Sequence, residues 1–182
     1  SGTFIRPLDG TNGIFTPDQI RVAMRSGSRN GPVSRMISVE QTSNGGGGTV
    51  WPLAAIQEVK KVADELGLIM HMDGARLLNA VVASGVSAKD FSNSFESAWI
   101  DLSKGLGCPI GGVLAGNKEF IEQAWRWKQR LGGSMRQAGV VASAGIYALE
   151  NNVERMADDH SNAKLLADQL ANMTGISIDT KT

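Results

Sequence analysis

The sequence has little of several features that whole classes of function require. A single cysteine, Cys108, leaves no partner for an internal disulfide, and two histidines are too few for a histidine-rich metal centre. Eighteen basic side chains balance eighteen acidic ones, so no net positive charge attracts nucleic acid or an anionic membrane surface. No apolar run reaches the ~20 residues that cross a bilayer. We therefore expect no nucleic-acid partner, no membrane partner and no resident metal, and we expect a reducing, cytoplasmic compartment.

What the chain does have is the composition of a globular domain and an excess of glycine. Its 182 residues are 42% hydrophobic and 20% charged, which excludes disordered, collagen-like and coiled-coil chains. The 22 glycines exceed the usual share of ~7%, and most of them mark turns between predicted elements. The length suits one domain with a substantial core and part of a second.

Apolar periodicity predicts strands that alternate with helices. Residues 35–40 (RMISVE) have the pattern of a strand, residues 53–66 that of an amphipathic helix, and residues 68–72 (LIMHM) that of a strand covered on both faces. A strand, a helix and a strand in this order predict a right-handed crossover and a parallel pair. The other expected elements are strands at 95–102, 110–115 and 176–179 and helices at 75–83, 117–130, 137–151 and 153–173. The alternation predicts an α/β layered domain.

Two of the predicted strands end in side chains that carry chemistry. In an open α/β sheet, ligands gather at the carboxyl ends of strands. The strand at 68–72 delivers Asp73, and the strand at 95–102 delivers Lys104 in a glycine-rich turn. A rigid, partly desolvated lysine suits a Schiff base, and an aspartate on a neighbouring strand suits the charged hydrogen bond to a pyridinium nitrogen. Together they indicate a pyridoxal-phosphate site, although either residue alone is more often a turn former or a solvated charge.

Three further features allow more than one interpretation. His71 lies two residues before Asp73 on the same strand face, where it is either a partner of the site or a core histidine. Cys108, four residues after Lys104, is expected to be a packing residue rather than a nucleophile. Glycines 45–48 are expected to form a flexible loop, since no Gly-Lys-Ser/Thr follows them to make a phosphate-binding loop.

Three stretches of sequence resemble the threonine aldolases of the β-eliminating lyase group. They are HMDGAR at 71–76, DLSKGLGCPIGG at 101–112 and LGGSMRQAGVVASAGIYAL at 131–149, in the order and separation of that family. The resemblance runs from about Pro32 to the end of the chain. It implies the α/β fold of the aspartate-aminotransferase-like (fold type I) enzymes, whose large domain has three αβα layers and which use pyridoxal 5'-phosphate.

The resemblance also implies an activity and an assembly. The reaction would be aldol cleavage of a β-hydroxy-α-amino acid, of threonine or allo-threonine type, to glycine and an aldehyde. The full protein would be a cytoplasmic homodimer or homotetramer with a small amino acid as its substrate. Two alternatives stay open, namely another pyridoxal-phosphate lyase that eliminates at the β-carbon and a non-catalytic fragment of such an enzyme.

Five residues receive roles from the resemblance. It implies that Lys104 binds the cofactor covalently, that Asp73 pairs with the ring nitrogen, and that Arg76 contacts the substrate carboxylate or the cofactor's phenolic oxygen. Arg136 would lie near the cofactor phosphate. His71 is counted with the cofactor-binding residues.

The chain departs from the family pattern in sequence and in length. Ser43 stands where the family commonly has a histidine beside the substrate hydroxyl, so either water or another group serves as base, or the preferred substrate differs. Family members are longer, so we expect this chain to be a fragment that is inactive alone. Residues 1–152 are expected to be part of the cofactor-binding large domain. Residues 153–182 are expected to be a linking helix and the start of an incomplete C-terminal small domain.

Overall fold

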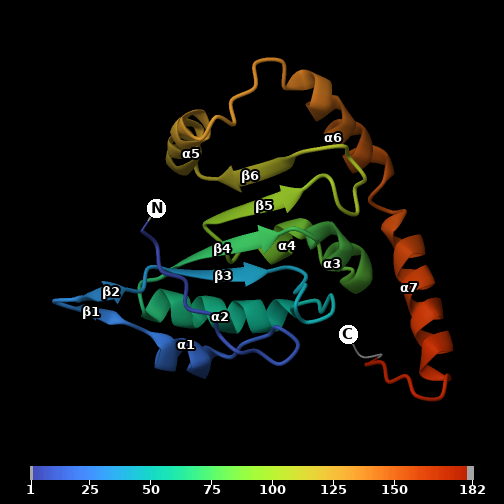
Figure 1. Cartoon of the computed structure of the whole chain (residues 1–182). Helices are drawn as coiled ribbons and strands as arrows, with labels where there is room; N and C mark the ends of the chain where they lie inside the picture. The colour runs from blue at the N-terminus through green and yellow to red at the C-terminus, as the bar shows by residue number, and fades with distance from the viewer. Residues whose placement is uncertain (1, 180–182) are drawn as a thin grey trace.

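A computed structural model describes residues 2–179, which form a four-stranded sheet with helices packed against it (Figure 1). The strands are β1 (Ser26–Ser28), β2 (Gly31–Val33), β3 (Met36–Glu40), β4 (Ile69–Gly74), β5 (Ser97–Asp101) and β6 (Gly112–Gly116). The helices are α1 (Pro17–Ala23), α2 (Leu53–Glu65), α3 (Leu77–Ser84), α4 (Ala88–Ser92), α5 (Lys118–Arg130), α6 (Gly139–Asn151) and α7 (Met156–Ala171). The sheet order is β3-β4-β5-β6, with the first three strands parallel and β6 antiparallel to β5, while β1 and β2 form a separate hairpin.

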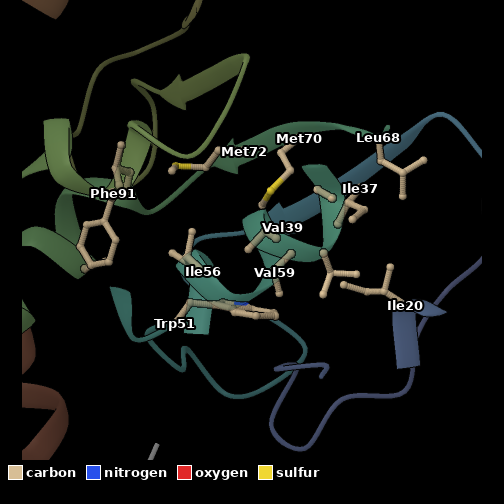
Figure 2. Close-up of a cluster of buried hydrophobic side chains, with 14 residues drawn as sticks. Ile20, Ile37, Val39, Trp51, Ile56, Val59, Leu68, Met70, Met72 and Phe91 are labelled. Carbon is tan, nitrogen blue, oxygen red and sulfur yellow. The ribbon is translucent and has the colours of Figure 1, made fainter. Parts of the chain in front are cut away.

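The predicted strand-helix-strand unit is present as β3, α2 and β4. The two strands pair in parallel, with Val39 beside Met72, which confirms the expected parallel pair. Apolar residues three and four positions apart give α2 one apolar face. Ile56 and Val59 of that face are fully buried in the main core, together with Val39 and Met70 (Figure 2). This packing fixes the position of β4 relative to α2.

The two faces of β4 differ in how well they are covered, and this corrects one expectation. Met70 and Met72 are fully buried, whereas Ile69 is 51% exposed and His71 and Asp73 are only partly buried. Successive side chains of a strand point to opposite faces, so the last three share the second face. The prediction that this strand is covered on both faces is therefore wrong for the described chain. The apolar run correctly predicted a strand, but it does not indicate which other segments of the chain cover the two faces of that strand.

We call the second face of the sheet the open face. Strand register places Ser97 beside His71 and Trp99 beside Asp73, so the alternate residues of β5 continue this face. Its members on the two strands are Ile69, His71, Asp73, Ser97, Trp99 and Asp101. Side chains that can take part in chemistry therefore lie on the less covered face of the sheet.

A second, smaller core lies beyond the carboxyl end of β5. Leu102, Leu106 and Cys108 from the loop after β5 are buried together with Ala148 of α6 and Met156 of α7. The prediction that the cysteine is a packing residue is confirmed. This core attaches α6 and α7 to the segment that carries the predicted lysine.

The C-terminal part of the described chain differs from the expectation in one place. α7 ends at Ala171, and residues 176–179 form no strand. Alternating letters produce a strand only where a sheet edge is available for pairing, and none of the described strands pairs with this segment. Between residues 2 and 179, no helix combines the length and the apolar character needed to cross a bilayer.

Candidate active site

Asp73 lies at the carboxyl end of β4, on the open face. Its Oδ1 accepts a hydrogen bond from the backbone N–H of Ala75 at 3.1 Å, which orients the carboxylate. Within residues 2–179, no cationic side chain forms an ion pair with it. An oriented carboxylate of this kind can bind a cation supplied by a ligand.

A buried glutamine fixes the backbone around Asp73. The N–H of Gln41 donates to the Asp73 carbonyl at 2.8 Å, and the Gln41 carbonyl accepts from the N–H of Arg76 at 3.0 Å. Its side-chain amide exchanges two hydrogen bonds with the backbone of Trp51, at 2.9 and 3.1 Å. Sequence reasoning did not single out this residue, and the available signal was an amide directly after a predicted buried strand.

Ser43 is occupied by the loop that follows it. Its Oγ accepts from the N–H of Gly46 at 3.3 Å, and its own N–H donates to the Thr49 carbonyl at 2.9 Å. A Cβ placed on Gly13 would lie 1.8 Å from this Oγ, so the side chain points at the N-terminal segment. The glycines at 45–48, expected to form a flexible loop, are therefore tied by hydrogen bonds.

Lys104 lies in the turn after β5, and its amine folds back toward the strand. The N–H of Gly107 donates to the Lys104 carbonyl at 2.8 Å, and Gly107 has φ +72°, a conformation that favours glycine. The Nζ atom lies 3.3 Å from Oδ2 of Asp101 and 5.8 Å from the ring centroid of Trp99. The side chain is 40% exposed, so it is partly covered and its amine contacts a carboxylate.

The turn that carries the lysine is closed at its base by Leu102. The N–H of Leu102 donates to the Gly111 carbonyl at 2.9 Å, and its carbonyl accepts from the N–H of Cys108 at 2.9 Å. The hydrogen bond to Gly111 continues the antiparallel pairing of β5 with β6, and the one from Cys108 closes the loop between them. The lysine backbone is therefore anchored on both sides of the turn.

Asp101 is a site residue that the sequence reasoning missed. Its Oδ1 accepts from the N–H of Ser103 at 2.8 Å and from the Ser103 hydroxyl at 2.7 Å. Burial by itself would raise the pKa of the Asp101 carboxyl, but the hydrogen bonds from Ser103 and the contact with Lys104 hold that pKa below its ordinary value. The carboxyl is therefore ionised at neutral pH. An aspartate three residues before a lysine, at a strand end, was the available signal.

His71 shares the open face with Asp73. Its Nδ1 lies 2.8 Å from Oγ of Ser97 on the neighbouring strand. Burial lowers the pKa of His71, and the negative charge of Asp73 and hydrogen bonding to Ser97 offset part of this effect. The ring is neutral at neutral pH, lies on the open face and contacts Ser97. Its position fits a partner of the site, and its partial burial with a polar contact fits a core histidine.

The two predicted arginines lie in different places. Arg76 is the N-cap of α3, and with Asp101 and Gly105 it lines a small cavity beside the lysine turn. Arg136 is exposed in the connection between α5 and α6, which runs on the β6 side of the sheet (Figure 1). The structure places Asp73, Arg76, Asp101 and Lys104 at or just after the carboxyl ends of β4 and β5, and His71 lies two residues before Asp73 on the same face of β4. The role of Arg136 stays a prediction.

Comparison with known proteins identifies the family of the chain. The model of the β-eliminating lyase family matches residues 1–182. The chain belongs to the β-eliminating lyase family. Among its relatives, the low-specificity L-threonine aldolase of Escherichia coli K12 is 43% identical over 164 residues, 90% of this chain and 46% of the relative. Low-specificity L-threonine aldolase 1 of Arabidopsis thaliana is 39% identical over 170 residues, 92% of this chain and 48% of the relative.

Solved structures show the same fold. A Listeria monocytogenes protein assigned as an L-allo-threonine aldolase superposes with a TM-score of 0.79 at 28% identity, over 92% of this chain and 45% of that one. The Leishmania major threonine aldolase gives a TM-score of 0.72 at 17% identity, over 88% and 47% of the two chains. The predicted fold-type-I class is therefore confirmed. This member of the β-eliminating lyase family spans about half the length of the curated relatives it matches.

Proposed function

We propose that this chain supplies part of the active site of a pyridoxal-phosphate-dependent lyase. The enzyme would cleave a β-hydroxy-α-amino acid of threonine or allo-threonine type to glycine and an aldehyde. The observation that carries the proposal is the placement of Asp73 and Lys104 at the carboxyl ends of neighbouring strands, beside one face of the sheet. Family membership and the names of the relatives favour carbon–carbon cleavage over elimination at the β-carbon.

The donor set fits this cofactor. A protonated pyridine nitrogen calls for a carboxylate, and Asp73 presents one that is oriented by Ala75 and has no cationic partner in the described chain. An aldehyde calls for a primary amine, which Lys104 supplies in an accessible turn. When bound, pyridoxal phosphate supplies an electron sink for the substrate bond that breaks.

Each residue of the site has a defined task in this proposal. The Asp73 carboxylate holds a proton on the ring nitrogen through its charge, and the neutral His71 ring lies beside it on the same face. The Lys104 amine would hold the cofactor through its aldehyde carbon. The Arg76 guanidinium binds the substrate carboxylate or the cofactor's phenolic oxygen, and Arg136 contacts the phosphate.

The β-hydroxyl of the substrate must lose a proton, and Ser43 is a poor candidate for accepting it. Its oxygen already accepts a hydrogen bond from Gly46, and a serine hydroxyl is not basic at neutral pH. Either water or another group accepts this proton, or the preferred β-hydroxy amino acid differs.

The same proposal covers organisation and assembly. Residues 1–152 would belong to the cofactor-binding large domain, and residues 153–182 would link it to a small domain. The single buried cysteine supports a cytoplasmic setting. Large apolar side chains exposed on α5, α6 and α7 support assembly as a homodimer or homotetramer. They include Trp125, Trp127, Ile146, Tyr147, Leu165 and Leu166.

A product assay tests the function. Protein expressed from its complete gene is incubated with pyridoxal phosphate and either L-threonine or L-allo-threonine, and glycine and aldehyde are measured separately. We expect equal amounts of the two products, loss of both in Lys104→Ala, and normal amounts in the control Lys128→Ala, which removes an exposed lysine of α5. Ammonia and a 2-oxo acid in place of these products would establish the elimination alternative. No product from any β-hydroxy amino acid would establish the non-catalytic one.

A further inference from the structure

The Lys104 amine contacts a carboxylate despite the length and exposure of its side chain. A lysine stem has four rotatable bonds and loses considerable rotamer entropy when it is fixed. Its Nζ nevertheless lies 3.3 Å from Oδ2 of Asp101, three residues earlier. The other carboxylate oxygen is fixed by two hydrogen bonds from Ser103, at 2.8 and 2.7 Å. The Asp101 carboxylate is therefore oriented independently of the lysine.

The Asp101 carboxylate also sets the direction in which the amine points. Trp99 lies beside Asp73 in the strand register, and Asp101 follows two residues later on the same face. The lysine amine lies 3.3 Å from this carboxylate and 5.8 Å from the Trp99 ring centroid. Both contacts place the amine near the open face, where it would meet an aldehyde bound near Asp73.

Other titratable groups lie on the elements around this turn. They are His71 and Asp73 on β4, Arg76 at the start of α3 and His160 on α7, whose Nε2 lies 3.2 Å from the amide nitrogen of Asn79. In the part of the chain that the structure describes, the lysine amine forms an ion pair with Asp101 and with none of these four. The carboxylate of Asp101 is thus the charge that acts on it most directly.

We propose that Asp101 is a positioning residue for Lys104, which holds the amine over the open face. The inference rests on the proposed function, because Asp101 acts only through the lysine. For the covalent link, an ammonium proton first leaves to solvent, the nitrogen then bonds to the aldehyde carbon, and the carbonyl oxygen departs as water. A carboxylate at 3.3 Å keeps the nitrogen in place for this step.

The rate of adduct trapping at a fixed pH tests the role. The protein from its complete gene is incubated with pyridoxal 5'-phosphate for a series of times, reduced with borohydride and digested, and the modified Lys104 peptide is quantified by mass spectrometry. In Asp101→Asn, which keeps an acceptor for Ser103 but loses the charge, we expect the rate of Lys104 labelling to fall by about threefold. Asp101→Glu should restore most of the difference. As a matched control, Asp64→Asn removes a carboxylate 2.7 Å from another lysine, and the rate of Lys104 labelling should not change.

A second measurement on the unaltered protein keeps the inference testable if Asp101→Asn does not fold. Added salt screens an exposed ion pair, so the rate of Lys104 labelling should fall as ionic strength rises. A labelling rate that changes with neither the substitution nor the salt would overturn the role of Asp101 alone. Absence of Lys104 labelling would instead overturn the proposed function, and this inference with it.

Discussion

At the scale of single residues, the carboxylate of Asp73 is expected to influence rate more than binding. Its charge stabilises a pyridinium whose electron demand grows in the transition state, while phosphate contacts supply most of the cofactor affinity. We expect Asp73→Asn to lower kcat by about 100-fold at saturating cofactor and to change the cofactor Kd by less than about tenfold. Steady-state kinetics and a spectroscopic titration of pyridoxal phosphate measure the two quantities.

The control for this prediction is Asp64→Asn, which removes a surface carboxylate of α2. It should leave both kcat and Kd unchanged. An unchanged kcat in Asp73→Asn with saturating cofactor would show that the carboxylate serves only to accept the Ala75 N–H and shape the turn.

Single residues also show where sequence reasoning succeeded and where it could not. Asp73 and Lys104 were found because a strand end is recognisable in the letters, and the end of a strand is where chemistry collects in such sheets. Asp101 was missed because its ion pair depends on how the turn folds back, and that geometry has no pattern in the sequence. The role of Ser43 was equally hidden, since its partner, Gly46, is set by the path of the loop.

At the scale of elements, the two faces of β4 predict different costs for neighbouring substitutions. Met70 is fully buried in the core under α2, so Met70→Ala should lower the free energy of unfolding by about 3 kcal/mol. Ile69, its neighbour, is 51% exposed on the open face, and Ile69→Ala should cost less than about 1 kcal/mol. Urea denaturation of both variants measures the difference. Equal costs would contradict the assignment of covered and open faces.

A second prediction at this scale concerns the link between α2 and β4. Glu96 accepts hydrogen bonds from the N–H of Met70 and from Lys60 of α2. Burial alone would raise the pKa of the Glu96 carboxyl, but these hydrogen bonds hold it below its ordinary value of 4.5. The unfolded chain therefore takes up this proton first as pH falls. The stabilisation by Glu96 is present above 4.5 and is lost as pH falls through the lower, folded-state pKa.

The measurement compares the wild type with Glu96→Gln. The difference between their free energies of unfolding should be larger at neutral pH than in acid, and chemical denaturation at both values determines it. Glu58→Gln is the matched control, because Glu58 pairs with Lys61 on the exposed side of α2 and should produce a smaller difference. A difference for Glu96→Gln that does not depend on pH would contradict the role of this carboxylate.

Most elements were predictable because their physics is local. The spacing of Ile56, Val59 and Val62 predicted α2. The helix expected at 117–130 corresponds to α5, whose cap Asn117 accepts a hydrogen bond from the N–H of Phe120. The cover of β4 was not predictable, because it depends on which distant segments reach each face. The strand expected at 176–179 failed for the same reason, since pairing requires an edge that its own letters do not specify.

At the scale of the whole molecule, a chain limited to residues 1–182 is expected neither to bind pyridoxal phosphate tightly nor to cleave threonine. The described residues leave the open face partly uncovered, and losing part of the group that fixes a substrate costs on the order of 100-fold in rate. Exposed apolar side chains on α5 to α7 should also make this chain associate.

Cofactor titration, an aldehyde assay and sedimentation velocity over a range of concentrations check these three expectations. The matched comparison is the protein from its complete gene under the same conditions. Micromolar cofactor binding together with measurable threonine cleavage by residues 1–182 would show that this chain is sufficient by itself.

The closure of the lysine turn by Leu102 has a consequence for motion. Leu102 is 7% exposed, and its two backbone hydrogen bonds join the base of the turn to Cys108 and to Gly111. The turn can open only when the end of the β5–β6 pair opens with it, so the amide protons of Leu102 and Cys108 should exchange with solvent far more slowly than those of the exposed Ser103 and Lys104. The fast movement left to the lysine is rotation of its own side chain, on picosecond to nanosecond timescales. The nitrogen thus searches a small volume quickly from a slowly moving backbone.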